Sequence, residues 1–246
     1  MKSTIFVATL IVAAMTTSAD AEPDEPDGRR ILQAVVAALP TNPLDISGDL
    51  LVRKRRGVPV HKRKFEINLN WGALPPVAEY TIRDGFGTAL ERLRVSHPKN
   101  ADEQIEFAVG ATLSPTNPPP LFTTVQDTDF TWADLTLSFL WWDNGKRVGS
   151  DKVRGRDCYI VDVPAPPENN TTTGAIYDHV RLWIDKEILL VLKAEGRDKN
   201  AAPIRRMWVR SFKKMNDQWM IKDMEIQALP ADQRTKMTIR EVNAAE

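Results

Sequence analysis

The chain has 246 residues with 33 basic and 33 acidic side chains, so its formal net charge is zero. Hydrophobic residues make up 42% of the sequence, which excludes a largely disordered chain and is enough for an ordinary core. The balanced charge argues against nucleic acid as a partner and against attraction of the whole protein to anionic lipid.

The N-terminus has the pattern of a secretory signal peptide. Lys2 precedes an apolar run from Ile5 to Met15, and Ala19-Asp20-Ala21 is a small-x-small cleavage site. The apolar run is too short to cross a bilayer, and no later run approaches transmembrane length. We therefore predict a signal peptide at 1–21, a flexible linker at 22–27 and an exported chain that does not span a membrane.

The first helix is predicted over 28–39. Ile31 and Val35 recur at helical spacing, Asp27 is a good N-cap residue, and Pro40 ends the pattern. This helix has a wide apolar stripe and should be well buried.

The periodicity then changes to two, which is typical of strands with one buried face. Residues 46–71 alternate in this way on both sides of the turn Gly57-Val58-Pro59 and are predicted to form an antiparallel hairpin. Further strands are predicted at 77–83, 89–96 and 104–109.

A second helix is predicted after the proline-rich break at 110–120. Thr131 and Asp134 match a capping box at its start. Its apolar stripe consists of Trp132, Leu135, Phe139 and Trp142. Asn144-Gly145 marks a turn after it.

From residue 155 the pattern predicts a meander of strands. The predicted strands are 155–163, 176–185, 188–196, 204–213, 219–228 and 234–242. Most of the connections are too short for parallel pairing, so neighbouring strands must be antiparallel. No repeat occurs at a fixed period, which disfavours a propeller or a solenoid.

The segment 181–198 is apolar on both faces of its two strands. One face is expected to carry Leu182, Ile184, Leu190 and Leu192. The other face is expected to carry Trp183, Leu189 and Val191. Such a sheet needs a cover on each side.

Signals of catalysis are weak. The three His residues have no metal-ligand spacing, and no phosphate-binding loop or nucleophile elbow occurs. Cys158, the single cysteine, could meet His179 as a nucleophile–base pair, but a core position within its apolar strand is favoured. Asp223 and Glu225 share one strand face and are favoured as solvated residues over an acid–base pair. We predict no enzyme, no metal and no cofactor.

A basic run lies at the tip of the first hairpin. Its members are Arg53, Lys54, Arg55, Arg56, Lys62, Arg63 and Lys64. No aromatic residue interleaves the run, so a solvated tip is favoured. The alternative is a contact for an anionic lipid headgroup or an acidic partner protein.

Several segments resemble the outer-membrane lipoprotein-sorting protein family (LolA-like), in its broad, mostly uncharacterised branch. They are TWADLTLSFLWW, GRDCYIVDVPAP, YDHVRLWIDKEILLVLKAEGRDK, RRMWVRSFKKMNDQWMIKDMEIQ and RTKMTIREV. The resemblance extends over residues 30–243, and the extra length relative to a compact carrier lies around 97–130. It implies a mainly β fold, in which a strongly curved antiparallel sheet forms an incomplete barrel and helices cover its concave face.

The resemblance also implies a function. We expect one domain over 28–246, a monomeric periplasmic carrier that binds the acyl chains of lipoproteins or lipids in an apolar cavity. The lining expected from strand alternation is Leu50, Val52, Phe65, Ile67, Leu69, Trp71, Leu182, Ile184, Leu190, Leu192, Val209 and Ile226. The stripe of the second helix would be the lid. The alternatives are a periplasmic sensor domain that regulates an envelope membrane protein through the basic hairpin, and a hydrolase on the same scaffold.

Overall fold

The computed structural model describes residues 26–54, 56–99, 102–166, 177–215, 218–230 and 232–245. The predicted signal peptide, most of the predicted linker and Arg55 therefore lie outside the described residues. No helix within these ranges combines the length and the hydropathy of a membrane span.

Short helices and long strands make up the described chain. The helices are α1 (Gly28–Ala37), α2 (Trp132–Thr136) and the 3₁₀ helix η1 (Ser138–Leu140). The first strands are β1 (Leu44–Lys54), β2 (Pro59–Asn70), β3 (Val77–Arg83), β4 (Ala89–Ser96), β5 (Gln104–Val109) and β6 (Ser114–Thr116). The others are β7 (Lys146–Val153), β8 (Arg156–Pro164), β9 (His179–Asp185), β10 (Val191–Arg197), β11 (Pro203–Met215), β12 (Gln218–Ala228) and β13 (Gln233–Ala244).

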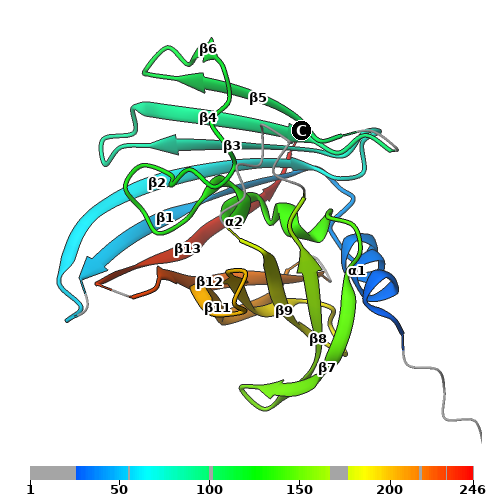
Figure 1. Cartoon of the computed structure of the whole chain (residues 1–246). Coiled ribbons are helices and arrows are strands. Elements are labelled where there is room, and N and C mark those ends of the chain that lie inside the picture. Colours follow the sequence, from blue (N-terminus) through cyan, green and yellow to red (C-terminus); the bar gives the residue numbers. More distant parts are fainter. Residues whose placement is uncertain are drawn as a thin grey trace, which may run out of the picture.

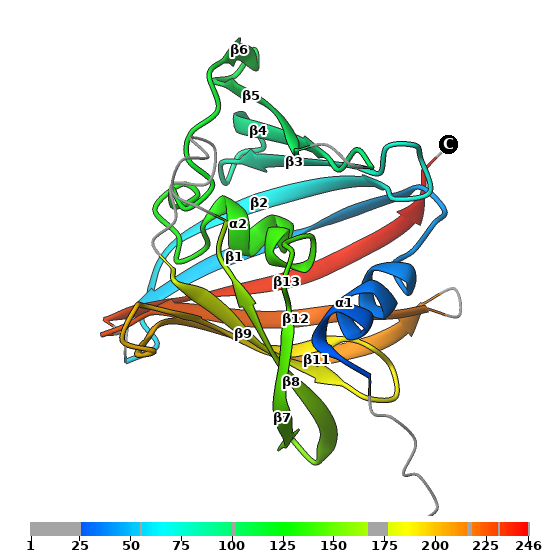
Figure 2. The same cartoon turned by 45° about the vertical axis from the view of Figure 1, so that its right-hand side comes forward.

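The strands form one antiparallel sheet in the order β6-β5-β4-β3-β2-β1-β13-β12-β11-β10-β9-β8-β7. The sheet is strongly curved and open: β6 and β7 are its two ends, and it does not close into a barrel (Figures 1 and 2). The predicted meander and its antiparallel pairing are confirmed. The sheet has 13 strands rather than eleven, because β6 and β7 were not predicted.

The first helix is confirmed, with a small difference at its end. The backbone N–H of Arg30 donates to Asp27 Oδ1 at 2.8 Å, so Asp27 is the N-cap as predicted. The helix ends at Ala37 and buries Ile31, Leu32 and Val35.

The second helix is shorter than predicted. The capping box of Thr131 and Asp134 is present, but α2 ends after five residues. Leu137 then adopts a left-handed conformation with φ 54°, and η1 follows. The Thr136 hydroxyl donates to the Trp132 carbonyl at 2.8 Å, a local bond that competes with regular helix. The predicted continuous stripe is therefore divided between two helical segments.

The sheet carries one large core on the face that we call the inner face. Residues of both halves of the sheet, of α1 and of the segment 121–140 belong to this cluster. The opposite face, here called the outer face, carries a small cluster of its own. It contains Cys158, Trp183 and Leu192, with Val153, Ile160, Leu190 and Phe212 packed against them.

The face predicted for Leu190 and Leu192 was wrong. Both residues lie in the outer cluster with Trp183, whereas Leu189 and Val191 pack against the inner core. The pairing of β10 with β9 shifts register between Val191 and Lys193. This irregularity inverts the alternation within the strand, which no count of period two can anticipate.

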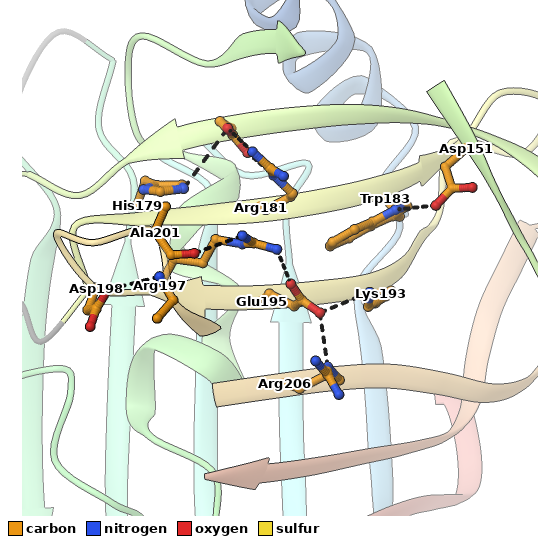
Figure 3. Close-up of polar contacts among 12 residues, drawn as sticks. Asp151, His179, Arg181, Trp183, Lys193, Glu195, Arg197, Asp198, Ala201 and Arg206 are labelled. Atoms are coloured by element: carbon orange, nitrogen blue, oxygen red, sulfur yellow. Dashed lines mark hydrogen bonds and ion pairs between the residues drawn. The ribbon is translucent and has the colours of Figure 1, made fainter. Parts of the chain in front are cut away.

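An ion-pair cluster completes the cover of the outer face beside Trp183 (Figure 3). Glu195 is only 3% exposed and accepts from Lys193 and Arg206, each at 2.9 Å, and from Arg197. The Lys193 ammonium also lies 3.7 Å from the centre of the Trp183 ring. Although burial raises it, these partners lower the pKa of Glu195 below its ordinary value. Charged side chains with long apolar stems thus cover the second apolar face.

Gly48 lies where β1 shifts register against β13, and its backbone is closely approached. A Cβ atom at this position would lie 2.2 Å from the Thr238 carbonyl oxygen and 2.5 Å from Cζ of Phe65. We therefore expect Gly48→Ala to lower the free energy of unfolding by about 1–3 kcal/mol, measured by urea denaturation. Gly85→Ala is the matched control, because nothing lies within 4 Å of its added Cβ. Equal stabilities of the two variants would refute this account of Gly48.

Candidate functional site

Most of the predicted cavity lining lies in a packed interior. The members found in the inner core are Leu50, Phe65, Ile67, Leu69, Leu182, Ile184 and Ile226, all at most 6% exposed. Val52 and Val209 are also buried, and Trp71 is half-buried at the edge of the core. Of the predicted lid, Trp132, Leu135 and Phe139 belong to the same core. We call α2 and η1, with Leu137 between them, the lid segment. The sheet and the lid segment are thus in direct contact.

A buried polar group attaches α2 to the sheet. Nε of Arg205, on β11, lies 3.6 Å from Oδ2 of Asp134, and the Tyr177 hydroxyl donates to Asp134 Oδ1 at 3.3 Å. Burial raises the pKa of Asp134, and attraction to Arg205 opposes the rise. These residues form an ion pair within an otherwise apolar interior.

The same arginine also holds the loop before α2. Arg205 donates to the carbonyl oxygen of Asp129, and the Asp129 carboxylate accepts from the Thr235 hydroxyl of β13 at 2.7 Å. We call Asp129, Asp134, Tyr177, Arg205 and Thr235 the inner polar network. This network connects the lid segment and the loop before it to β11 and β13, which follow much later in the sequence.

A groove of about 960 Å³ opens at one end of the sheet. It lies between the β2–β3 turn, the β4–β5 loop, the residues after η1 and the end of β8. Its apolar lining is Leu74, Trp141, Trp142, Ala165 and the prolines 75, 76, 98, 164 and 166. We call it the end groove. Leu74 at its border is 97% exposed, so this edge presents apolar surface to solvent.

Aromatic side chains connect the end groove with the interior. Trp142 packs edge-on against Phe139, with ring centres 6.3 Å apart, and lies 6.1 Å from Phe122. Phe122 in turn packs against Tyr177 of the inner polar network, with ring centres 4.6 Å apart. Trp142 is therefore the one residue of the predicted lid that both borders this groove and packs against the described core.

Two titratable side chains lie in the wall of the end groove. Nδ1 of His97 is 3.6 Å from Oε1 of Glu103, and the Ser138 hydroxyl donates to the same oxygen at 3.2 Å. Burial raises the pKa of Glu103 to about 7 and lowers the pKa of His97 to about 4. The His97 ring stacks on Trp141 with a centroid distance of 4.0 Å. The sequence did not indicate this site, because Ser138 and Trp141 lie far along the chain from the β4–β5 loop that carries His97 and Glu103.

The candidate nucleophile pair is not assembled. Cys158 is opposite Asp185 in the β8–β9 pairing, whereas His179 is opposite Pro164 at the other end of these strands. Asp223 and Glu225 are ion-paired with Lys236 and Arg210 at 2.8 and 2.7 Å. The described residues also contain no group of three His, Cys, Asp or Glu arranged to hold a metal ion.

The basic hairpin lies at the far end of β2 from the end groove. Lys62 is paired with Asp49 at 2.9 Å, while Lys54, Arg56 and Lys64 are exposed. Arg53 and Arg63 are half-buried. Two apolar residues of the tip are also exposed, Val58 at 59% and Val60 at 47%. The twelve residues of β2 separate the two sites by about 40 Å, at a rise of about 3.3 Å per residue.

Comparison with known proteins identifies relatives of this fold. A family model described as "-like: Uncharacterized protein" matches residues 120–246. No curated protein matches the chain in sequence.

Three solved structures share the architecture at low sequence identity. A DUF1329 family protein from Desulfovibrio piger has a TM-score of 0.72 and 14% identity, over 88% of this chain and 91% of that chain. A domain assigned as an outer membrane lipoprotein-sorting protein from Vibrio parahaemolyticus has a TM-score of 0.71 and 13% identity, over 88% of this chain and 91% of that chain. A LolA superfamily protein from Nitrosomonas europaea has a TM-score of 0.67 and 9% identity, over 90% of this chain and 94% of that chain. The LolA-like fold expected from the sequence is confirmed.

Proposed function

This chain belongs to the protein family described as "-like: Uncharacterized protein", and we propose that it is a non-enzymatic periplasmic carrier for the acyl chains of lipoproteins or lipids. The observation that carries the proposal is the end groove, whose Trp and Pro lining continues through Trp142 into the apolar inner core. The LolA-like fold is compatible with this role, and the affinity can come from hydrocarbon burial alone. Each buried CH₂ contributes about 0.8 kcal/mol, so a chain of about twelve carbons offers roughly 10 kcal/mol before entropy losses.

In this proposal α2 and η1 cover the concave face of the sheet as a lid. The packed interior is then the resting, closed state of the carrier. The expected lining becomes accessible only when the lid segment moves away from the strands. An acyl chain would enter at the end groove and replace the contacts that the lid makes with the sheet.

Several features of the lid segment favour such movement. The five residues of α2 are too few for a stable isolated helix, so its position depends on tertiary contacts. Leu137 joins it to η1 in a left-handed conformation that costs roughly 1–2 kcal/mol for a residue with a side chain. A segment held in this way can leave the sheet without disrupting a strand pairing.

Native mass spectrometry of the protein purified from its own envelope tests the function. We expect a co-purifying lipid or acylated protein. A stoichiometric protein partner without lipid would instead favour the sensor hypothesis, with the basic hairpin as its contact. Protein free of both would contradict the carrier proposal.

Trp142→Ala is expected to weaken binding of a fluorescent fatty acid about tenfold, which corresponds to about 1.4 kcal/mol. The reason is that Trp142 forms both the wall of the end groove and its junction with the core. Fluorescence titration measures the effect. Trp219→Ala is the matched control, because Trp219 is a partly exposed tryptophan that packs on Phe212, away from this groove. Unchanged affinity of the Trp142 variant would exclude the groove as the binding site.

A further inference from the structure

Glu103 is a largely buried carboxylate in the wall of the end groove, with 21% of its side chain exposed. Among the described residues, no Lys or Arg lies within ion-pair distance of it, and His97 is its basic neighbour at 3.6 Å. Because burial lowers the pKa of His97 to about 4, that ring carries no charge near pH 7. Partial burial of such a carboxylate favours its protonated form or its pairing with a cation from outside.

Aromatic rings line the same groove as this carboxylate. Trp141 and Trp142 line the same groove as Glu103. A tryptophan ring attracts a positive charge placed over its face, and this attraction is stronger where water is excluded. Carboxylate and indole together are the surroundings that a protonated or quaternary amine prefers.

The other charged residues along the groove also favour a positively charged ligand. Asp102 and Asp143 border the groove together with Glu103, and Lys99 is the one Lys or Arg among its described lining residues. An anionic headgroup would therefore meet repulsion, and a neutral one would leave Glu103 unbalanced. The apolar edge formed by Leu74 and the prolines remains available for a hydrocarbon chain.

We propose that the end groove binds an alkyl or acyl ligand through a positively charged amine, which pairs with Glu103 beside Trp141 and Trp142. This inference rests on the proposed carrier function and specifies its ligand class, a cationic aminolipid. The chain of the ligand runs along the apolar lining, and its amine replaces the proton that Glu103 otherwise holds.

Amine binding should depend on pH. The pKa of Glu103 is about 7, so the fraction of ionised carboxylate rises from about one tenth at pH 6 to about nine tenths at pH 8. The neighbouring groups keep their charge in this range: His97 stays neutral, and burial raises the pKa of Tyr80, which therefore stays protonated. The other titratable residues among the described lining of the groove are Lys99, Asp102 and Asp143. Affinity for the amine is therefore expected to rise up to about tenfold from pH 6 to pH 8.

Isothermal titration tests the inference with decylamine and decanoate below their micellar concentrations and with decanol below its solubility limit. At pH 8 we expect decylamine to bind at least tenfold more tightly than the other two. Glu103→Gln should remove that advantage and its pH dependence while binding of decanol is unchanged. Glu106→Gln is the matched control, because Glu106 is an exposed residue of β5 that is paired with Arg94.

The outcomes separate the inference from the function on which it rests. Equal affinity for the three ligands, or a Glu103→Gln variant that still prefers the amine, would overturn the amine site and leave the carrier. Absence of binding of all three ligands would overturn the carrier function itself. Methylamine distinguishes the source of the amine: binding as tight as that of decylamine would show a site for small amines and would refute an aminolipid.

Discussion

Replacing Asp134 with Ala is expected to lower the free energy of unfolding by about 3–5 kcal/mol, as measured by urea denaturation. The variant loses the carboxylate that pairs with Arg205 at 3.6 Å and accepts from Tyr177, and it leaves the buried guanidinium without this counter-ion. It also loses the capping box at the start of α2. These effects act on the same segment that the carrier proposal requires to move.

Asp134→Asn separates the charge from the hydrogen bonds. The amide retains an oxygen that can accept from Thr131, so the expected loss is smaller, roughly 1–3 kcal/mol. If Asp134→Ala stayed within 1 kcal/mol of the unmodified protein, the inner polar network would not hold the lid segment. In the carrier the destabilised lid should also accelerate uptake of a fluorescent fatty acid, which stopped-flow fluorescence would measure.

Replacing Glu195 with Ala is expected to cost a similar amount, about 3–5 kcal/mol, because it also removes a buried carboxylate from paired cations. The substitution leaves Lys193, Arg197 and Arg206 close together without their shared carboxylate (Figure 3). Repulsion among three cations adds to the loss of the buried hydrogen bonds. Urea denaturation at neutral pH measures the difference.

Glu106→Ala provides the comparison, because Glu106 pairs with Arg94 in a solvent-exposed position and should cost less than about 1 kcal/mol. The stabilisation that Glu195 contributes should also decrease at low pH. Its pKa is lowered from 4.5 in the folded protein, so its contribution is complete above about 4.5 and is lost as the pH falls through the folded value. If Glu195→Ala and Glu106→Ala lowered the free energy of unfolding equally, burial would not explain the contribution of Glu195.

The strands could be predicted because one of their faces is buried and the other is polar. The predicted strands 77–83, 89–96 and 104–109 coincide with β3, β4 and β5. β7 was missed because half of its eight residues are charged and none is buried, which removes the apolar alternation. β6 was missed because its three residues include Pro115, which is typical of a break and is tolerated at the edge of a sheet.

The site was less predictable, for two physical reasons. A local irregularity in β10 reverses the faces of Leu190 and Leu192, and its cause is a pairing that the sequence does not express. Glu103 and Trp141 come from different loops, which only the curved sheet brings to one groove. Arg205 did leave a signal: it shares the phase of Met207 and Val209 in an otherwise apolar face, which indicates a buried cation with a partner.

The position of β13 has a consequence for biosynthesis. β1 pairs along its whole length with β13, from Leu44 opposite Ala244 to Lys54 opposite Gln233. The centre of the sheet therefore cannot form until translation has reached residues 233–244, and contacts so distant in sequence are slow to form. A prematurely terminated chain that lacks this strand would leave β1 and β12 with unpaired edges, which are templates for aggregation. The sheet can therefore assemble fully only after β13 has been synthesised. Folding intermediates that lack β13 are species that a cell must protect or degrade.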